Sequence, residues 1–352
     1  MVAETSAFSG RRRLKALGAL LGPGDQPPQD PLVLDLLATG GGWQSVFAEA
    51  DDEDLSPLLY ASILRKGINL WVPEHQIDLI RHAHGRNNER NLKIRAQIKA
   101  IATALDQAGV RATLLGETAS LADDVYGDLG APVIDDISFL IDEDNLQAAV
   151  DGLSAAGYVC PESPAWQGKQ CQPLVRDGEP APARLNRWLG EQHHVLRAEE
   201  VLDATVCIEM DDVALPIPSP IHRLFQNCFQ AQFEGMAFDL YRLPLSALTE
   251  QSYIIHRHGQ PEPDMALEQN LRRAGLAKAF HSHRIAALWL FEGGDGSSVE
   301  ATLDVHSRLC LARRSTRWVD APLSVLAGIA GNLRWSSVGK RNGGSTTNAG
   351  VG

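Results

Sequence analysis

The chain has 352 residues, enough for one large domain or two ordinary ones without help from disulfides or metals. Apolar residues make up 44% of the sequence and charged residues 22%, which excludes both a disordered chain and a fibrous one. The formal net charge of −12 opposes non-specific attraction to nucleic acid or to an anionic membrane. We therefore expect a folded protein that binds neither nucleic acid nor membrane.

Compartment and redox state follow from what the chain lacks. No apolar run approaches the roughly 20 residues that a membrane span needs, and the stretch after Arg11–Arg13 has no clear cleavage site. The cysteines are odd in number and scattered, with neither a zinc spacing nor a disulfide framework. We expect a cytoplasmic protein with reduced thiols at Cys160, Cys171, Cys207, Cys228 and Cys310.

The first 108 residues are predicted to form a helical N-terminal region. Asp30-Pro31 and Ser56-Pro57 each begin an apolar run that ends at glycine, which is typical of short helices with proline in the first turn. From Pro73 to Ala108, apolar residues recur at helical spacing, and Gly109 supplies the stop.

An α/β unit is predicted from residue 109 to residue 215. Short apolar runs bounded by glycine predict strands, and apolar residues at helical spacing predict helices. Residues 161–192 are rich in Pro, Gly, Gln and Arg and are expected to form a long loop or insertion. The predicted strands are Val110–Leu115, Val133–Ile141, His193–Leu196 and Ala204–Met210, with helices over Ser120–Tyr126 and Asn145–Ala156.

The last third of the chain is predicted to be helical again. Ser219-Pro220 begins a helix, and helical patterns continue through a C-terminal region over 216–335. Residues 336–352 are mostly Gly, Ser, Thr and Asn, so we expect a disordered tail. The fold class predicted for the whole chain is α+β, with a small mixed sheet flanked by two helical regions.

The stretch from Val110 to Tyr158 has a characteristic order: strand, glycine-containing turn, short helix, acidic strand, helix and Gly-Tyr. This order resembles the uncharacterised nucleotidyltransferase family of the polymerase-β-like superfamily. That family reads L-K-G-x-x-L-A, then Tyr, then Arg, then an Asp-x-Asp strand, with a third acid in a strand of the type Val-Asp-Leu-His. An Asn/Arg-rich long helix before this stretch and a helical region opening near Pro-Ser-Pro fit the family as well. The resemblance implies a nucleotidyltransferase fold and Mg²⁺-dependent use of a nucleoside triphosphate.

Such a site has a clear physical logic. Two carboxylates two residues apart on a strand point to one face and can bind the same Mg²⁺. A glycine turn ahead of a helix offers N–H groups to phosphates. On the family pattern, however, Asp136 alone keeps its identity. The other positions differ: Glu117 stands in place of Lys, Thr118 in place of Gly next to Gly116, Pro132 in place of Arg, and Ser138 in place of the second Asp.

The remaining acids give candidate ligands. Asp135 projects to the face opposite Asp136 on a regular strand, so this pair does not chelate one ion unless a bulge intervenes. A third carboxylate can be sought in Ala204–Met210, where Glu209 is the only acid. Glu209 is either a ligand or a solvent-facing acid, and Cys207 is the other counterpart that the resemblance allows. Asp136 and Glu209 are thus the candidate catalytic and metal-binding residues, and Gly116, Glu117, Thr118 and Ser138 are the candidate nucleotide-binding residues.

These changes lead to our main hypothesis, a nucleotidyltransferase-like protein with a degraded catalytic site that acts by binding, scaffolding or regulation. Glu117 places an anion where a triphosphate would lie, at a repulsion of roughly a few kcal/mol. The alternative is an active enzyme in which Asp136, Glu209 and either Asp135 or Asp142 hold Mg²⁺ and a nucleotidyl group passes from a triphosphate to a small molecule or peptide. A third hypothesis is a protein-interaction module that uses the helical flanks and the 161–192 stretch.

Overall fold

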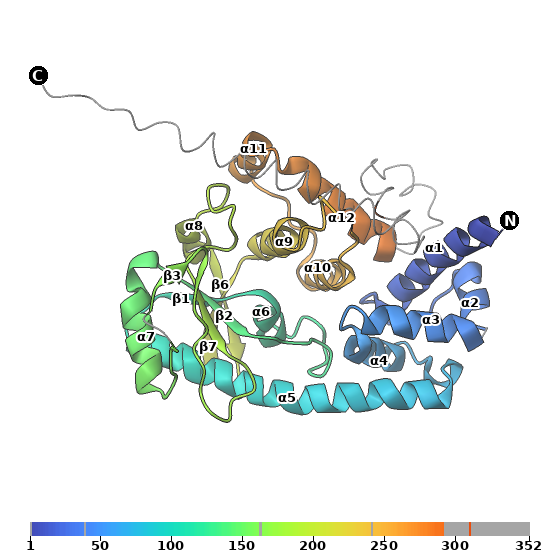
Figure 1. Ribbon diagram of the computed structural model, residues 1–352, viewed down its shortest axis with the longest axis horizontal. Helices are drawn as coiled ribbons and strands as arrows, with labels where there is room; N and C mark the ends of the chain where they lie inside the picture. The colour runs from blue at the N-terminus through green and yellow to red at the C-terminus, as the bar shows by residue number, and fades with distance from the viewer. Residues whose placement is uncertain (1, 39, 162–163, 241, 292–309, 311–352) are drawn as a thin grey trace, which may run out of the picture.

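The computed structural model describes residues 2–38, 40–161, 164–240, 242–291 and Cys310. Helices from both ends of this part of the chain surround a small sheet (Figure 1), so the predicted α+β class is confirmed. None of the helices in these ranges combines the length and apolar character needed to cross a bilayer. The helices predicted beyond residue 291 and the predicted tail over 336–352 lie outside the described residues.

The N-terminal region is helical, and its helices share an apolar core that includes Leu17, Trp43 and Leu59. Proline stands in the first turn of the helix that begins at Ser56, as its sequence predicts. The elements are α1 (Val2–Leu21), α2 (Pro31–Leu37), α3 (Gly40–Asp51), α4 (Ser56–Arg65), η1 (Asn69–Trp71) and the long helix α5 (Glu74–Gln107).

A five-stranded mixed sheet forms the centre, in the order β1-β2-β5-β4-β3. Strand β2 pairs antiparallel with β1 and parallel with β5. Residues 161–192 were predicted to be a long loop or insertion, and the loop alternative is wrong because this stretch contains β3, β4 and β5. Strand β5 has only four residues and lies in a Pro- and Arg-rich stretch, so its alternation of apolar and polar side chains was too short to identify it as a strand. The strands are β1 (Ala112–Leu114), β2 (Ile137–Ile141), β3 (Trp166–Gln167), β4 (Gln170–Cys171) and β5 (Ala183–Asn186).

Two further strands, β6 (Thr205–Met210) and β7 (Val213–Pro218), form a separate antiparallel hairpin. The hairpin lies beside β1, where the Thr113 hydroxyl donates to the Pro216 carbonyl at 2.9 Å. The strand predicted over His193–Leu196 is wrong, since that stretch is a turn whose Val195 and Leu196 are buried against neighbouring helices.

Alternation along β2 sets the two faces of the sheet. Ile137 and Phe139 pack with the apolar faces of α5 and of α7 (Leu146–Ala155). Leu140 packs instead in a cluster with Phe225 of α9 (Pro220–Phe229). Because side chains two residues apart share a face, Ser138 belongs to the α9 side of the sheet.

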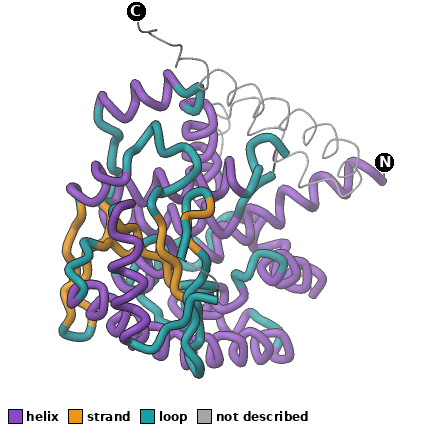
Figure 2. The backbone as a smooth tube through the Cα atoms, turned by 60° about the vertical axis from the view of Figure 1, so that its left-hand side comes forward, coloured by secondary structure: helices purple, strands orange, loops and turns teal. Residues whose placement is uncertain are grey.

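The C-terminal helices bridge the sheet and the N-terminal region. Tyr253 and Trp289 join the apolar core of the N-terminal helices, so the two helical regions pack together rather than standing apart. Figure 2 shows the strands grouped among the helices. The elements are α8 (Ala198–Asp203), α9 (Pro220–Phe229), the π-helical turn η3 (Gln230–Glu234), α10 (Leu245–His258), α11 (Met265–Arg273) and α12 (Ala277–Phe291).

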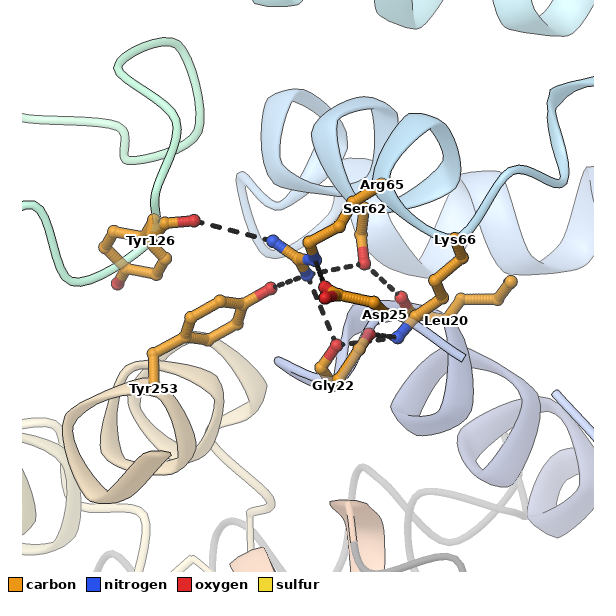
Figure 3. Close-up of polar contacts among 9 residues, drawn as sticks. Leu20, Gly22, Asp25, Ser62, Arg65, Lys66, Tyr126 and Tyr253 are labelled. Carbon is orange, nitrogen blue, oxygen red and sulfur yellow. Dashed lines mark hydrogen bonds and ion pairs between the residues drawn. The ribbon is translucent and has the colours of Figure 1, made fainter. Parts of the chain in front are cut away.

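Two cations at the end of α4 tie the helical regions together (Figure 3). Lys66 Nζ donates to the Gly22 carbonyl at 2.9 Å, just past the end of α1, where a cation complements the exposed carbonyls. Burial, with Arg65 adding to the effect, lowers the pKa of Lys66 to about 8. Arg65 donates to the Tyr253 hydroxyl of α10 and, at 3.5 Å, to the Tyr126 carbonyl. The junction therefore fixes the backbone at Tyr126.

Candidate functional site

The site begins at the turn between β1 and α6 (Gly116–Ala122). Gly116 has φ +58°, a left-handed conformation that favours glycine. Its N–H donates to Oε1 of Gln226 on α9 at 3.3 Å, and the Thr118 hydroxyl donates to the Leu115 carbonyl at 2.6 Å. Two of the groups that were expected to face phosphates are therefore engaged within the protein.

The Asp136 carboxylate stands at the start of β2 and is held on both oxygens. Ser138 Oγ donates to Oδ1 at 2.7 Å, and Arg184 Nε donates to Oδ2 at 2.7 Å. In the parallel pairing of β2 with β5, Arg184 lies directly across from Ser138. The half-buried Asp136 side chain is thus neutralised by a cation from the neighbouring strand.

The strand beside β2 is β5, whereas Ala204–Met210, where a third carboxylate was sought, pairs with β7 in a separate sheet. Glu209 is exposed on β6 and lies opposite Ala214 of β7, in the separate hairpin. The physical reason is that alternation tells which residues share a face but not which strands pair. Of the predicted site residues, the structure brings Asp136 and Ser138 together and leaves Glu209 on another sheet.

Arg184 is the site residue that the sequence reasoning missed. The strand Ala183-Arg184-Leu185-Asn186 fits the type Val-Asp-Leu-His, with apolar residues in the first and third places. Arg184 falls where that pattern has its acid. The alternation of apolar and polar side chains could have indicated a strand here, but these residues belong to the stretch 161–192 that was predicted to be a long loop or insertion.

The residues present do not fit a magnesium ion with its triphosphate. The positions that would carry three carboxylates hold one carboxylate, one hydroxyl and one guanidinium, at Asp136, Ser138 and Arg184. Mg²⁺ prefers oxygen ligands and is repelled by a guanidinium. Within the described ranges, no group of three or more His, Cys, Asp or Glu side chains is placed to hold a metal ion.

Helix α5 holds the segment that leads into β2. Asn87 Nδ2 donates to the carbonyls of Gly130 and Pro132 at 2.8 and 2.7 Å. Asn91 Nδ2 donates to the carbonyls of Leu129 and Pro132, both at 2.8 Å. These bonds give the asparagines of the long helix a physical role, because a segment without regular structure needs partners for its carbonyls.

The same helix also holds the segment that leads into β5. Arg90 donates to the Ile134 carbonyl and, at 3.2 Å, to the Pro180 carbonyl. Gln97 Nε2 donates to the Ala181 carbonyl at 2.6 Å. Helix α5 thereby sets the relative position of the two strands that carry Asp136 and Arg184.

A buried polar network fixes α6 from the other side. The Ser120 hydroxyl donates to Oε1 of Glu250 on α10 at 2.5 Å, and Asn227 Nδ2 donates to Glu250 Oε2 at 2.8 Å. Arg223 of α9 donates to Ser120 Oγ at 3.0 Å and to Asp123 Oδ2 at 2.6 Å. Buried charges are expected to be paired in this way, and the network locks α6 to α9 and α10.

Glu117 is an exposed acid on α6, the helix that this network holds. Its side chain is exposed, yet surrounding protein and the charges of Glu250, Asp136 and Asp135 raise the pKa of Glu117 to about 7. Removal of water is the largest of these causes, and the charge of Glu250 comes next. The position that carries lysine in the family pattern therefore presents a carboxyl group among other carboxylates.

Tyr126 lies in the segment after α6, and its ring packs against the ring of Tyr253 on α10 with the centroids 4.9 Å apart. It is only 8% exposed, and burial together with the charges of Glu250 and Glu117 raises the pKa of Tyr126 well above its usual value. Sequence reasoning used Tyr126 only as an alignment anchor, because nothing in the chain order tells that it packs against a helix more than a hundred residues later.

A family model described as an uncharacterised nucleotidyltransferase matches residues 39–292. The match includes the turn at Gly116, strand β2 and strand β5, and it extends into both helical flanks. No curated protein and no solved structure matches the chain.

Proposed function

Because this chain belongs to the uncharacterised nucleotidyltransferase family, we propose that it keeps the family fold but acts by binding, scaffolding or regulation rather than by nucleotidyl transfer. One observation carries the proposal. The guanidinium of Arg184 stands at the place of the third acid and is paired with Asp136, the one acid that keeps its identity.

The positive charge of Arg184 disfavours the binding of a catalytic metal ion. A divalent ion about 4 Å from the guanidinium would be repelled by on the order of 8 kcal/mol at an effective dielectric constant of about 20. The ion would also have to displace the bonds that Ser138 and Arg184 make to Asp136. A single carboxylate offers too few oxygen ligands to offset this repulsion and the loss of these hydrogen bonds.

The turn that would receive the triphosphate supports the same proposal. The Gly116 N–H and the Thr118 hydroxyl are used internally, and Glu117 presents a carboxyl group where phosphates would need a cation. A ligand that enters this turn as a polyanion would meet repulsion and few free donors.

Isothermal titration of the purified chain with ATP, CTP, GTP and UTP in the presence of Mg²⁺ tests the proposal. We expect no saturable binding of any of the four, in either the wild-type chain or the Asp136→Ala variant. The rival hypothesis, an active enzyme with rearranged acids, predicts Mg²⁺-dependent binding and turnover that disappear in Asp136→Ala. Turnover of this kind would overturn the proposal.

A further inference from the structure

Strand β6 leaves one of its two edges unpaired. Within the ranges that the structure describes, β6 pairs with β7 and with no other strand. We infer that this edge joins the β6 edge of a second copy of the chain, antiparallel and with Cys207 opposite Cys207 at the two-fold axis. The hairpin holds neither Asp136 nor Arg184, so the inference goes beyond the proposed function and does not depend on it.

The turn of the hairpin decides which backbone groups face the open edge. Strands β6 and β7 are joined by the two residues 211–212, with φ of +50° and +65°, the geometry of a type I′ turn. The residues that flank such a turn exchange hydrogen bonds, and hydrogen-bonded and non-hydrogen-bonded pairs then alternate along the two strands. The N–H and C=O groups of Thr205, Cys207 and Glu209 therefore point away from β7.

Two prolines of β7 give an independent check on this alternation. Pro216 lies opposite Cys207, and Pro218 lies opposite Thr205. Proline is tolerated in a strand where its nitrogen faces away from the neighbouring strand. The Pro216 carbonyl accepts from the Thr113 hydroxyl of β1 at 2.9 Å, so the backbone of Pro216 faces β1 and not β6. Cys207 and Thr205 are therefore in non-hydrogen-bonded pairs with β7, and their own backbone groups belong to the free edge.

The residues of β6 favour the addition of a strand. The strand reads Thr-Val-Cys-Ile-Glu-Met, which is rich in β-branched residues and has no proline or lysine to block pairing at the edge. The Val206 side chain is 44% exposed, and Cys207 is exposed as well. A two-stranded hairpin is only marginally stable by itself, and further strands stabilise it. A second β6 would extend the hairpin to a four-stranded sheet.

The sequence of β6 is complementary to itself in one register, which identifies a second copy as the occupant. Pairing centred on Cys207 sets Val206 opposite Ile208. It also sets Thr205 opposite Glu209, where a hydroxyl can donate to a carboxylate. Directly opposed side chains share a face, so apolar groups meet on one face and polar groups on the other. All three free-edge residues are paired in this register, with about six backbone hydrogen bonds.

Other registers are less favourable, and the pairing is closed. A register centred on Glu209 would set two like charges directly opposite each other. Registers centred on residues 206 or 208 leave part of the free edge unpaired. Because the two-fold pairing uses the free edge of both copies, assembly stops at a dimer.

Sedimentation velocity of the full chain over a series of micromolar concentrations tests the inference. One strand pair is a small interface, so we expect monomer and dimer in exchange. Cys207→Pro removes an N–H group from the free edge and none from the pairing with β7, and it should shift the chain to monomer. Cys207→Ser keeps the N–H group and is the matched control, which should dimerise like the wild-type chain. A wild-type chain that is monomeric throughout, or a dimer that Cys207→Pro leaves unchanged, overturns the inference.

Substitutions at position 205 test the register without changing the backbone. Thr205→Glu sets a carboxylate opposite Glu209 at both ends of the strand pair, and the repulsion should raise the dissociation constant of the dimer by several-fold. Thr205→Lys sets a cation opposite the same carboxylate and should not weaken the dimer. If Cys207→Pro does not fold, these two variants decide the result, and equal effects of both on the dissociation constant overturn the inference.

Oxidation with diamide gives a third readout. Opposed residues in a hydrogen-bonded pair have Cα atoms about 5.5 Å apart, a separation that a disulfide spans. Two Cys207 thiols would lose two protons and two electrons to diamide, which becomes the hydrazine. Mass spectrometry should find this disulfide in the dimer and not in Cys207→Ser. A dimer in which Cys207 stays reduced or joins a different cysteine overturns the inference. None of these outcomes changes the proposed function, which nucleotide titration tests separately.

Discussion

Arg184 lies directly across from Ser138 in the parallel pair β2–β5, and both side chains donate to the same carboxylate, that of Asp136. Each bond is 2.7 Å long. The charge that a metal would neutralise in the family is thereby neutralised by a side chain of the protein itself. A guanidinium cannot replace a metal as an acid catalyst, but it can hold the two strands together.

The first prediction is that carboxylates at positions 138 and 184 restore metal binding. The double variant Ser138→Asp with Arg184→Asp places three acids on two neighbouring strands, and their mutual repulsion lowers stability without metal. Mg²⁺ at about 100 times its dissociation constant should then stabilise the double variant by about 2.7 kcal/mol. Thermal unfolding with and without MgCl₂ measures this difference. MgCl₂ should not change the thermal stability of the wild-type chain or of the Ser138→Asp variant. If it does not stabilise the double variant either, the assignment of Arg184 to the position of the third acid is contradicted.

A second prediction concerns the pH dependence of stability. The pKa of Glu117 is raised to about 7 in the folded chain, so the folded state holds this proton more tightly than the unfolded state does. The stabilisation from the neutral form is complete at pH values below the unfolded pKa and is lost as pH rises through about 7. Because the side chain is exposed and solvent screens its charge, we expect Glu117→Gln to raise the free energy of unfolding by only about 1 kcal/mol at alkaline pH. It should add almost nothing at about pH 4.

Urea unfolding of the wild-type chain and of Glu117→Gln across this pH range is the measurement. Glu209→Gln, an exposed acid in the hairpin, controls for the loss of one negative charge from a chain with a net charge of −12. An equal stabilisation by both substitutions would assign the effect to overall charge and not to the surroundings of Glu117.

Local patterns in the sequence are sufficient to predict the elements around Asp136. The turn at Gly116, the acidic strand β2 and the helix after it are where the periodicity puts them, because each is set by nearby residues. Strand β5 could not be found in the same way. It has four residues, and its place beside β2 depends on a pairing between segments more than forty residues apart.

The polar network beneath α6 also lay beyond sequence reasoning, for a different reason. Arg223 and Glu250 are charged residues on helices, and helical charges normally face solvent. Here they are buried because each finds a partner a hundred or more residues away, at Asp123 and Ser120. The residues of α9 and α10 near Arg223 and Glu250 in the sequence do not indicate that these partners exist.

The third prediction follows from that burial. Arg223 is 4% exposed and Asp123 5%, so Arg223→Met leaves a buried carboxylate that has, among the described residues, His258 at 2.7 Å and Arg257 at 3.5 Å as ion-pair partners. Removing one member of a buried ion pair typically costs about 3–5 kcal/mol. Arg95→Met breaks the more exposed pair with Asp211 and should cost about 1 kcal/mol or less. Urea unfolding of the two variants compares the losses, and equal values would show that the network contributes no more than a surface ion pair.

The last prediction tests the hold of α5 on the strand that carries Asp136. Asn91 is fully buried, and its amide donates to the carbonyls of Leu129 and Pro132. Asn91→Ala leaves the Leu129 carbonyl without this donor, at about 1–3 kcal/mol for an unsatisfied buried group, while Asn87 still donates to the Pro132 carbonyl. Hydrogen exchange of the backbone over 128–136 should therefore quicken more than exchange in the hairpin β6–β7.

Asn88→Ala is the matched control, because Asn88 stands on the same helix and is not buried. It should change neither the stability nor the exchange of this segment by a comparable amount. Since Ile134 and Pro180 are held by Arg90, the strand pairing itself survives in Asn91→Ala and only the segment before β2 loosens. Exchange that quickened equally in β5 would instead mean that the asparagine supports the whole sheet, and the separate roles given to Asn91 and Arg90 would be wrong.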